Sequence, residues 1–433
     1  MQLFLIILFT FLSAGSFWLF LRGKYKLSPL WLMLSVWFIA IAISQLNLST
    51  LELPWSGKYW GLLLISLISF CLGFFVFNHP GLDPGSTSRI PASAGMGSSK
   101  LRWVIYILFA ISLLALYLFY QNAGNFPLLA PDPYAFRFTA DESVPGLINY
   151  LSQLARIFIP LSFFVFFAEK FSWKKHWDLI GICVIGVWFL ILFASRTQIF
   201  FIDLWIMALY LLMRKPNLKQ ALKFYPVFLL VSVLVLAAVP LYRNYKSYGA
   251  DYLGSITGID TSNYNVVQKA LVPIYVGVSF NQQALLHAEN YYQDHEVQKG
   301  RVFLDPFTNI FGKVIKPLNQ FKSNYDLGAI FHPWWNTGTY LFPFVQDFGT
   351  VAFYFIPFII AGILTWAWKY WETRPNFLST NLYAYTMFFI VMTVYLSFTV
   401  RAEMYLDLAL LLLIYLILVW TPRISVRGGA NES

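Results

Sequence analysis

Residues 180–213 read IGICVIGVWFLILFASRTQIFFIDLWIMALYLLM, which is two apolar runs joined by a short polar turn. Extended to 178–194 and 197–213, each run has about the 17 residues that a helix needs to cross the hydrocarbon core of a bilayer. The turn between them holds Arg196, flanked by the hydroxyl side chains of Ser195 and Thr197. The stretch therefore predicts two membrane-spanning helices that meet at a single arginine.

The rest of the chain has the same character. Of its 433 residues, 58% are hydrophobic and only 12% are charged, which excludes an ordinary soluble domain. The first apolar run has no basic residue before it, so it does not read as a cleaved signal peptide. We therefore expect an all-α polytopic membrane protein with about eleven transmembrane helices, at 2–21, 28–46, 59–77, 102–120, 147–168, 178–194, 197–213, 222–240, 348–369, 379–399 and 403–420.

Lysine and arginine are distributed unevenly between the short loops. They concentrate after spans one, three, five, seven and nine, whereas the loops after spans two, four, six and ten hold few. Because cytoplasmic loops are enriched in these residues, the N-terminus is predicted outside and the C-terminus in the cytoplasm. The net charge of +10 then reflects anchoring at the membrane, and no nucleic-acid partner is expected.

Only one segment outside the predicted spans is long. Residues 241–346 separate spans one to eight (1–240) from spans nine to eleven with the cytoplasmic tail (347–433). The charge count places this large loop, between spans eight and nine, on the outside. Within it, 270–289 is apolar but interrupted by proline, glycine and amide residues. We expect that stretch to lie on the membrane surface or re-enter the membrane without spanning it.

Several common catalytic motifs are missing. The chain has no GxxxxGK[ST] loop, no CxxC pair, no HExxH and no Asp-x-Asp that would hold a magnesium ion with a nucleotide sugar. Cys71 and Cys183 both fall inside predicted spans, where small apolar packing is their expected role. We therefore expect no cofactor and no metal, and any group transfer to use a donor activated without either.

Arginines recur at the predicted outer ends of the spans. Guanidinium groups stay charged and bind phosphate oxygens in bidentate fashion, and helix N-termini also favour anions. The set suits a lipid diphosphate at the interface, and its members are Arg137, Arg156, Arg196, Arg243 and Arg401. The alternatives are that Arg196 snorkels to anchor its helix end, and that Arg137 and Arg243 are solvated loop residues.

Two aspartates follow these arginines inside the same spans. Asp203 lies seven residues after Arg196 and hence on the same helix face, and Asp407 lies similarly after Arg401. They would orient or neutralise those arginines, or form purely structural charge pairs.

Aromatic residues make up 20% of the chain, and many crowd the large loop. Aromatic faces stack on sugar rings, but they also form the belt found at membrane interfaces. The residues that we single out as candidates for sugar binding are Trp334, Trp335 and Tyr340.

Residues 332–349 read HPWWNTGTYLFPFVQDFG and run straight into predicted span nine. The order of residues here resembles a signature of bacterial oligosaccharide repeat unit polymerases, the O-antigen polymerase family. In that order asparagine and threonine come first, then an aromatic residue, and then Asp347-Phe348-Gly349 entering a helix. The turn around Arg196 resembles the mid-chain arginine of that family. The FPLL segment at 126–129 followed by Arg137 resembles its first outer-loop signature, and Arg401 before the last span is similar as well.

The resemblance implies a metal-independent glycosyltransferase in the bacterial inner (plasma) membrane. Such polymerases move a glycan from undecaprenyl diphosphate onto the sugar end of another lipid-linked repeat unit at the outer leaflet. Their partners would be the lipid-linked donor and acceptor, the bilayer, a chain-length regulator and a flippase. A glycan ligase that uses the same donor, and a flippase for lipid-linked oligosaccharides, are the rival interpretations.

On this hypothesis Arg196 and Arg401 hold the diphosphate, with Arg156 as a third candidate. A general base would deprotonate the acceptor hydroxyl. The first candidates are His332 and Asp347, and the next are His287 and Asp326. The alternative for Asp347 is a helix N-cap.

Overall fold

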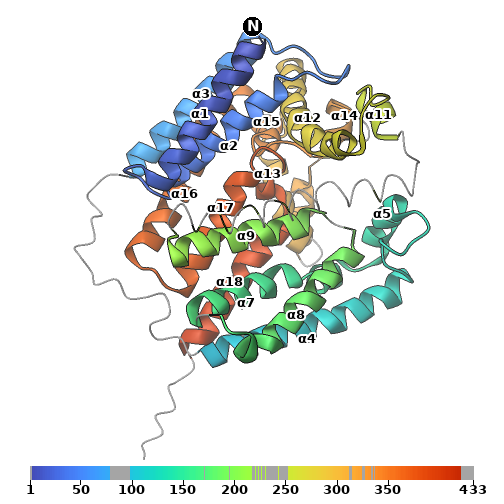
Figure 1. Ribbon diagram of the computed structural model, residues 1–433. Helices are drawn as coiled ribbons and strands as arrows, with labels where there is room; N and C mark the ends of the chain where they lie inside the picture. The colour runs from blue at the N-terminus through green and yellow to red at the C-terminus, as the bar shows by residue number, and fades with distance from the viewer. Residues whose placement is uncertain are drawn as a thin grey trace, which may run out of the picture.

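The computed structural model describes residues 2–78, 98–169, 171–194, 196–216, 252–311, 315–323, 327–332 and 337–420, together with a few isolated positions that include 335. These residues form helices and no strand (Figure 1). The first half contains α1 (Gln2–Arg22), α2 (Pro29–Ser44), α3 (Gly57–Phe77), α4 (Ser98–Ala123), α5 (Pro133–Ser143), α6 (Gly146–Ser152), α7 (Ala155–Glu169), α8 (Trp173–Leu192) and α9 (Arg196–Arg214).

The second half contains short helices between long ones. It comprises α11 (Tyr252–Thr257), α12 (Val266–Asp294), α13 (Arg301–Phe311), η2 (Lys316–Phe321), α14 (Leu327–Ile330), α15 (Phe342–Phe348), η3 (Gly349–Val351), α16 (Ala352–Thr373), α17 (Phe377–Met392), η4 (Phe398–Val400) and α18 (Ala402–Trp420).

In the part of the chain that the structure describes, eight helical segments are long and apolar enough to cross a membrane, and α2 and α17 are shorter apolar helices. Ten of the eleven expected spans therefore coincide with helices. The expected span at 222–240 lies outside the described residues, apart from isolated positions. The chain is an all-α polytopic membrane protein.

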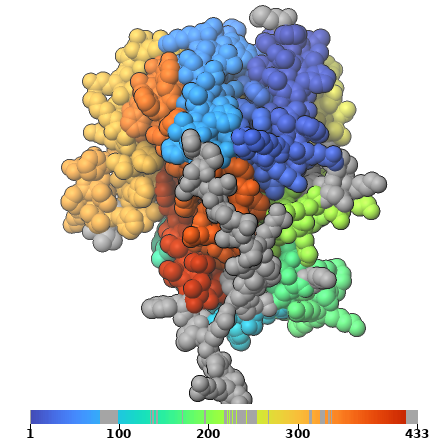
Figure 2. All heavy atoms as spheres, turned by 90° about the vertical axis from the view of Figure 1, so that its left-hand side faces the viewer, coloured from blue at the N-terminus to red at the C-terminus, as the bar shows by residue number. Residues whose placement is uncertain are grey.

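Helices on the outside of the bundle present large apolar side chains rather than polar ones. Leu3 and Phe11 on α1, Trp103 on α4 and Trp177 on α8 have relative exposures between 67% and 74%. In water such a surface would be unfavourable, but lipid tails are as apolar as these side chains. The whole outline of α1 is visible on the surface in Figure 2, in dark blue.

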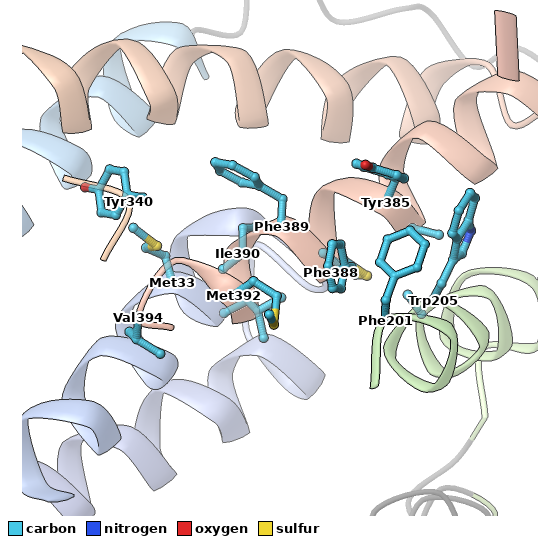
Figure 3. Packing of buried hydrophobic residues seen from close by; sticks show 14 of the residues in the cluster. Met33, Phe201, Trp205, Tyr340, Tyr385, Phe388, Phe389, Ile390, Met392 and Val394 are labelled. Atoms are coloured by element: carbon cyan, nitrogen blue, oxygen red, sulfur yellow. The ribbon is translucent and has the colours of Figure 1, made fainter. Parts of the chain in front are cut away.

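The interior is filled by aromatic and sulfur-containing side chains at the crossing points of helices (Figure 3). The rings of Phe201 on α9 and Phe388 on α17 lie 4.2 Å apart between centroids. The rings of Trp205 and Tyr385 extend the same contact at 5.3 Å. Helix α17 is thus held between α9 on one side and α2 on the other, so it forms the centre of the bundle.

The described loops lie in two groups, one at each end of the bundle. At one end, residues 47–56 and the segment after α17 both contact α12: Leu53 exchanges two hydrogen bonds with the Gln283 side chain, and Asn281 donates to the Tyr395 carbonyl. At the other end, the Tyr383 hydroxyl of α17 donates to the Leu27 carbonyl in the turn between α1 and α2. The N-terminal end of α1 lies toward the α12 end of the molecule (Figure 1).

The stretch 270–289, which we expect to lie on the membrane surface or to re-enter the membrane, belongs to α12. This is one continuous helix packed against α2 and α15, it is not among the candidate spans, and its interrupting amides are fully buried. Asn281, Gln282 and Gln283 face protein because each has hydrogen-bond partners there, which the apolar stretch alone did not indicate.

Helices α3 and α16 approach so closely at Gly73 that a side chain has no room. A Cβ atom there would lie 2.5 Å from the Phe358 carbonyl oxygen, whereas one at Gly61 of the same helix would meet nothing within 4 Å. We expect Gly73→Ala to destabilise the fold by about 1–3 kcal/mol through overpacking. Thermal unfolding of the purified protein, followed by size-exclusion chromatography after heating, measures the effect.

The matched control is Gly61→Ala, for which we expect an unchanged or slightly raised Tm because alanine is the better helix former. Equal melting temperatures for Gly73→Ala and the unsubstituted chain would show that α3 and α16 are not packed this closely.

Candidate functional site

Three helices begin at or next to an arginine. Arg156 is the second residue of α7, Arg196 is the first residue of α9, and Arg401 immediately precedes α18. Helices α7 and α9 run in the same direction, because Phe167 and Tyr210, near their C-terminal ends, lie 5.7 Å apart. Arg156 lies inside the bundle, since α6 and α7 together form one candidate span at Gly146–Glu169, whereas Arg196 and Arg401 lie at the starts of theirs. The N-termini of α9 and α18 thus add their positive dipole ends beside two arginines.

The turn before α9 has the form that the sequence predicts. Helix α8 ends at Leu192, Ala194 adopts a left-handed backbone conformation with φ of 49°, and α9 starts at Arg196. The expectation that Arg196 opens a helix is confirmed. The Arg196 side chain lies outside the described residues.

The FPLL segment at 126–129 packs directly against this turn. The Leu128 N–H donates to the Leu192 carbonyl at 2.9 Å, and the Phe126 ring lies 6.3 Å from the ring of Phe193. Helix α5, which carries Arg137, joins the same apolar cluster through Ala140, and Val144 directly after the helix belongs to the cluster as well. Two stretches about 65 residues apart in the sequence are therefore brought together. The side chain of Arg137 and all of Arg243 lie outside the described residues.

Arg156 is buried and forms an ion pair within the protein. Its Nη2 atom lies 2.9 Å from Oδ1 of Asp407, and the two side chains are 3% and 4% exposed. The hydroxyls of Tyr150 and Tyr385 donate to the two oxygens of the same carboxylate at 3.1 and 3.2 Å. The guanidinium also lies over the Tyr150 ring at 4.9 Å.

The two expectations for Asp407 were that it acts on Arg401, six residues before it, or that it forms a structural charge pair; the structure pairs it with Arg156 of another helix. The partner differs because Arg401 lies before the first residue of α18 and is exposed, whereas the Asp407 side chain is buried inside the bundle. A buried charge is tolerated when it is paired and hydrogen-bonded. Arg156 is therefore neutralised in place, and its main role in this conformation is to join α7 to α18. Asp203, the other expected partner, is also buried.

Of the two arginines of the set whose side chains the structure describes, Arg401 is the exposed one. It lies between η4 and α18 in an extended backbone conformation, and its N–H donates to the Phe398 carbonyl. Within the described part of the chain its guanidinium forms no ion pair. Its guanidinium is thus accessible to an external anion.

Asp347 holds another helix. Its Oδ1 accepts the N–H of Val302 at 3.0 Å and its Oδ2 accepts the N–H of Phe303 at 2.8 Å, so the carboxylate caps the first turn of α13. The side chain is fully buried. The predicted alternative, a helix cap, is thus the role that the geometry supports, although Asp347 caps α13 rather than its own helix. A carboxylate with both oxygens engaged and no exposure cannot reach an acceptor hydroxyl in this conformation.

The other two residues of the Asp-Phe-Gly sequence, Phe348 and Gly349, form the junction between α15 and the next helix. Gly349 has φ of 62°, a left-handed conformation that side chains rarely adopt, and it ends α15 before η3 and α16 continue the chain. Phe348 is 42% exposed. This sequence therefore builds a helix junction that fixes α13 against α15.

The aromatic residues proposed for sugar binding are not available as an open platform. Trp335 is 8% exposed and its indole N–H donates to Asn281, while Tyr340 is 1% exposed and packs edge-on against Trp37. Their rings fill the contact between α12, α2 and the end of α17, so the expectation of sugar stacking is not supported for these two. Trp334 lies outside the described residues.

Of the candidate bases, two histidines remain. His332 is half-buried, and the Phe331 ring beside it lies 5.0 Å from the ring of His287 on α12. Burial lowers the pKa of His287, which favours its neutral imidazole and makes it a weaker base than an exposed histidine. Asp326 lies outside the described residues.

Polar residues on α12 form a second network that the sequence interpretation did not identify. The carboxylate of Glu52 accepts hydrogen bonds from the Tyr275 hydroxyl, the Ser279 hydroxyl and the Ser49 N–H. About three turns further along α12, buried Glu289 forms an ion pair with Lys58 at 2.6 Å. The signal available in the sequence was the presence of polar residues, among them Ser279 and Glu289, within an apolar stretch.

Among the described residues no group of three or more histidine, cysteine, aspartate or glutamate side chains is arranged to hold a metal ion. Comparison with protein-family models, curated proteins and solved structures finds no match for this chain.

The buried pair makes a testable prediction. Asp407→Leu should lower stability by about 3–5 kcal/mol because it leaves the Arg156 charge buried without a partner. The double variant Arg156→Leu with Asp407→Leu should recover most of that loss, since it removes both charges. Melting temperatures of the three proteins in the same detergent give the comparison, and additive losses would contradict the pairing.

A second prediction concerns the cap on α13. Asp347→Ala leaves two buried N–H groups without an acceptor and should cost about 1–3 kcal/mol for each. We expect a lower Tm and faster proteolysis within α13, whereas Asp294→Ala at the exposed end of α12 should change neither. Unaltered proteolysis of Asp347→Ala would exclude the capping role.

Proposed function

We propose that this protein is a membrane-embedded glycosyltransferase that polymerises lipid-linked oligosaccharide repeat units at the outer leaflet of a bacterial plasma membrane. Its donor would be a glycan on undecaprenyl diphosphate, and its acceptor the sugar end of a second lipid-linked repeat. The observation that carries the proposal is that α9 begins at Arg196 and α18 begins directly after Arg401. Phe201 and Phe398, close to these two helix starts, both pack on the Phe388 ring, which brings the starts near one another.

In the proposed reaction an acceptor hydroxyl attacks the anomeric carbon of the donor glycan. A carbon–oxygen bond forms there as the bond from that carbon to the diphosphate oxygen breaks, and the hydroxyl proton passes to a general base. Negative charge develops on the leaving lipid diphosphate. Fixed guanidinium groups and helix N-termini stabilise that charge most when they are placed before the reaction begins.

The arginines at the two helix starts would have a different role from the buried one. Arg401 is exposed before α18, and Arg196 is the first residue of α9, so these two would hold the diphosphate. Arg156 is engaged in its buried pair with Asp407. It would support the site by fixing the relative positions of α7 and α18 rather than by binding phosphate.

Segments that resemble the polymerase family gather around these arginines, which supports the proposal. The FPLL segment packs on the end of α8 beside Arg196. Asp347 caps α13, and α13 in turn contacts the start of α18 through Phe307 and Tyr405, whose rings lie 4.8 Å apart. The Asp-Phe-Gly sequence would thus act on the site indirectly, by holding α13 beside Arg401.

The proposed orientation has the N-terminus outside and the C-terminus in the cytoplasm. It rests on the bias of lysine and arginine between loops. The contact of residues 47–56 and 393–401 with α12 supports it, because the charge bias assigns all three to the same face.

We assign the general base to His332, with His287 as its neighbour on α12. Asp347→Asn keeps one acceptor oxygen for the cap, so we expect it to retain most activity, while His332→Ala should lose most of it. Transfer assayed with purified protein and a lipid-linked repeat distinguishes the two. Activity that is lost in Asp347→Asn while its Tm is unchanged would return the base role to Asp347.

The decisive experiment is a size profile of surface glycan from cells that lack this gene and are then supplied with variants. We expect deletion to collapse a ladder to a single repeat unit, and the unsubstituted chain to restore it. Arg196→Ala and Arg401→Ala should each fail to restore it, because a cation that stabilises the leaving group is lost. Removal of such a group commonly costs a factor of about 100 to 1,000 in rate.

Arg214→Ala is the matched control, since Arg214 lies at the opposite end of the same helix as Arg196 and is exposed. It should restore the ladder fully. Restoration by Arg196→Ala as well would mean that Arg196 only anchors its helix. A normal ladder that stays on undecaprenyl diphosphate would indicate a ligase, and complete loss of exported glycan would indicate a flippase.

A further inference from the structure

The hairpin formed by α13 and η2, here residues 299–311 and 315–323, exposes apolar side chains although it is not a candidate span. Phe303, Leu304, Phe311, Ile315 and Phe321 have relative exposures between 37% and 48%. Leu304 and Phe311 lie seven residues apart and therefore on the same face of α13. The opposite face, with Val302 and Pro306, is buried against the bundle.

The described part of the same hairpin exposes four basic side chains. Lys299, Arg301, Lys316 and Lys322 are all exposed. Its one acidic residue in that part, Asp305, is half-buried, and its two oxygens accept hydrogen bonds from the N–H and the hydroxyl of Ser323. These bonds hold the end of η2 against α13 and occupy the carboxylate, so the exposed charge of the described hairpin is predominantly basic.

The hairpin lies at the height where membrane-spanning segments begin. Helix α13 packs against η4 and the first turn of α18, and on its other side against α15. Candidate spans start at Ala402 and at Phe342, in these same two places. The exposed apolar side chains are therefore at the boundary of the hydrocarbon core and not far out in the water.

We propose that the α13–η2 hairpin is an interfacial membrane-binding element whose partner is an anionic phospholipid surface. Apolar side chains flanked by lysine and arginine are the composition with which amphipathic segments lie in the headgroup region, because the apolar groups enter the acyl boundary while the cations meet phosphate oxygens. The partner is a lipid surface rather than a second protein copy because the described hairpin exposes four cations together with its apolar side chains, and its one acid is half-buried and hydrogen-bonded.

The consequence is a link between the bilayer and the entrance of α18. Asp347 caps α13 on its buried side, and the lipid surface would hold its exposed side, so the helix beside Arg401 is fixed from both directions. The inference concerns lipid binding alone and stands whether or not the protein transfers sugars.

Spin labels report directly on this contact. In a chain with Cys71→Ala and Cys183→Ala, labels would be attached at Leu304→Cys and Phe321→Cys, with Asn263→Cys on an exposed loop as the control. Full-length protein is placed in nanodiscs of phosphatidylcholine with or without phosphatidylglycerol. We expect labels 304 and 321 to be accessible to oxygen and protected from a water-soluble nickel complex, and the control label to show the reverse.

The charged part of the inference is tested with Lys316→Glu and Lys322→Glu together. In discs with phosphatidylglycerol this variant should shift label 321 toward water, with a smaller shift in phosphatidylcholine alone. Labels as open to the nickel complex as the control would overturn the proposal, as would labels shielded from both reagents, which would indicate a protein partner. If the double variant fails to fold, the labels in the unsubstituted charge background still decide the question.

Discussion

The ion pair between Arg156 and Asp407 determines how helices α6, α7, α17 and α18 are arranged. Neither charge could stay in an apolar interior alone, and removing one would leave the other without a partner. The two residues come from α7 and α18, and the hydroxyls of Tyr150 and Tyr385 add α6 and α17 to the same carboxylate. A single buried cluster therefore holds four helices in register. The arginine-bearing helix starts at that end of the bundle depend on it for their spacing.

Around α12, polar contacts join a helix to a loop at the end of the bundle instead of joining helices in its interior. Helix α12 is joined to residues 47–59 by hydrogen bonds of Glu52 and Gln283 and by the pair of Lys58 with Glu289. These groups lie at the end of the bundle, where water can reach at least Lys58, whose side chain is half exposed. They fasten a long helix across the top of α2 and α3 while close apolar packing, as at Gly73, brings α3 against α16. The opposite end is fastened by Arg102, Lys175 and His176 around Glu169.

The proposed function depends on which arginines remain accessible after the structural ion pairs have formed. Arg156 is engaged by Asp407, so its charge is compensated, whereas Arg401 is exposed at a helix entrance with no ion pair in the described part of the chain. The Asp-Phe-Gly sequence contributes a cap and a left-handed glycine rather than a reactive carboxylate. A rigid frame around an exposed arginine such as Arg401 suits the proposed electrostatic stabilisation of a leaving diphosphate, because the frame keeps the cation in place while charge develops.

The sequence alone determined the features that depend on local length and charge. Ten of its expected spans are helices because a run of apolar residues long enough to cross a bilayer must satisfy its backbone groups within itself, and Arg196 opens α9 because a polar turn interrupts two such runs. Contacts between distant residues were decided only by the tertiary structure. Asp407 meets Arg156 across 251 positions, Asp347 caps a helix 44 residues earlier, and the amides of α12 are buried against other helices. Side-chain pairing depends on which helix faces come together in three dimensions, and the apolar pattern of a nearly all-apolar helix does not specify that face.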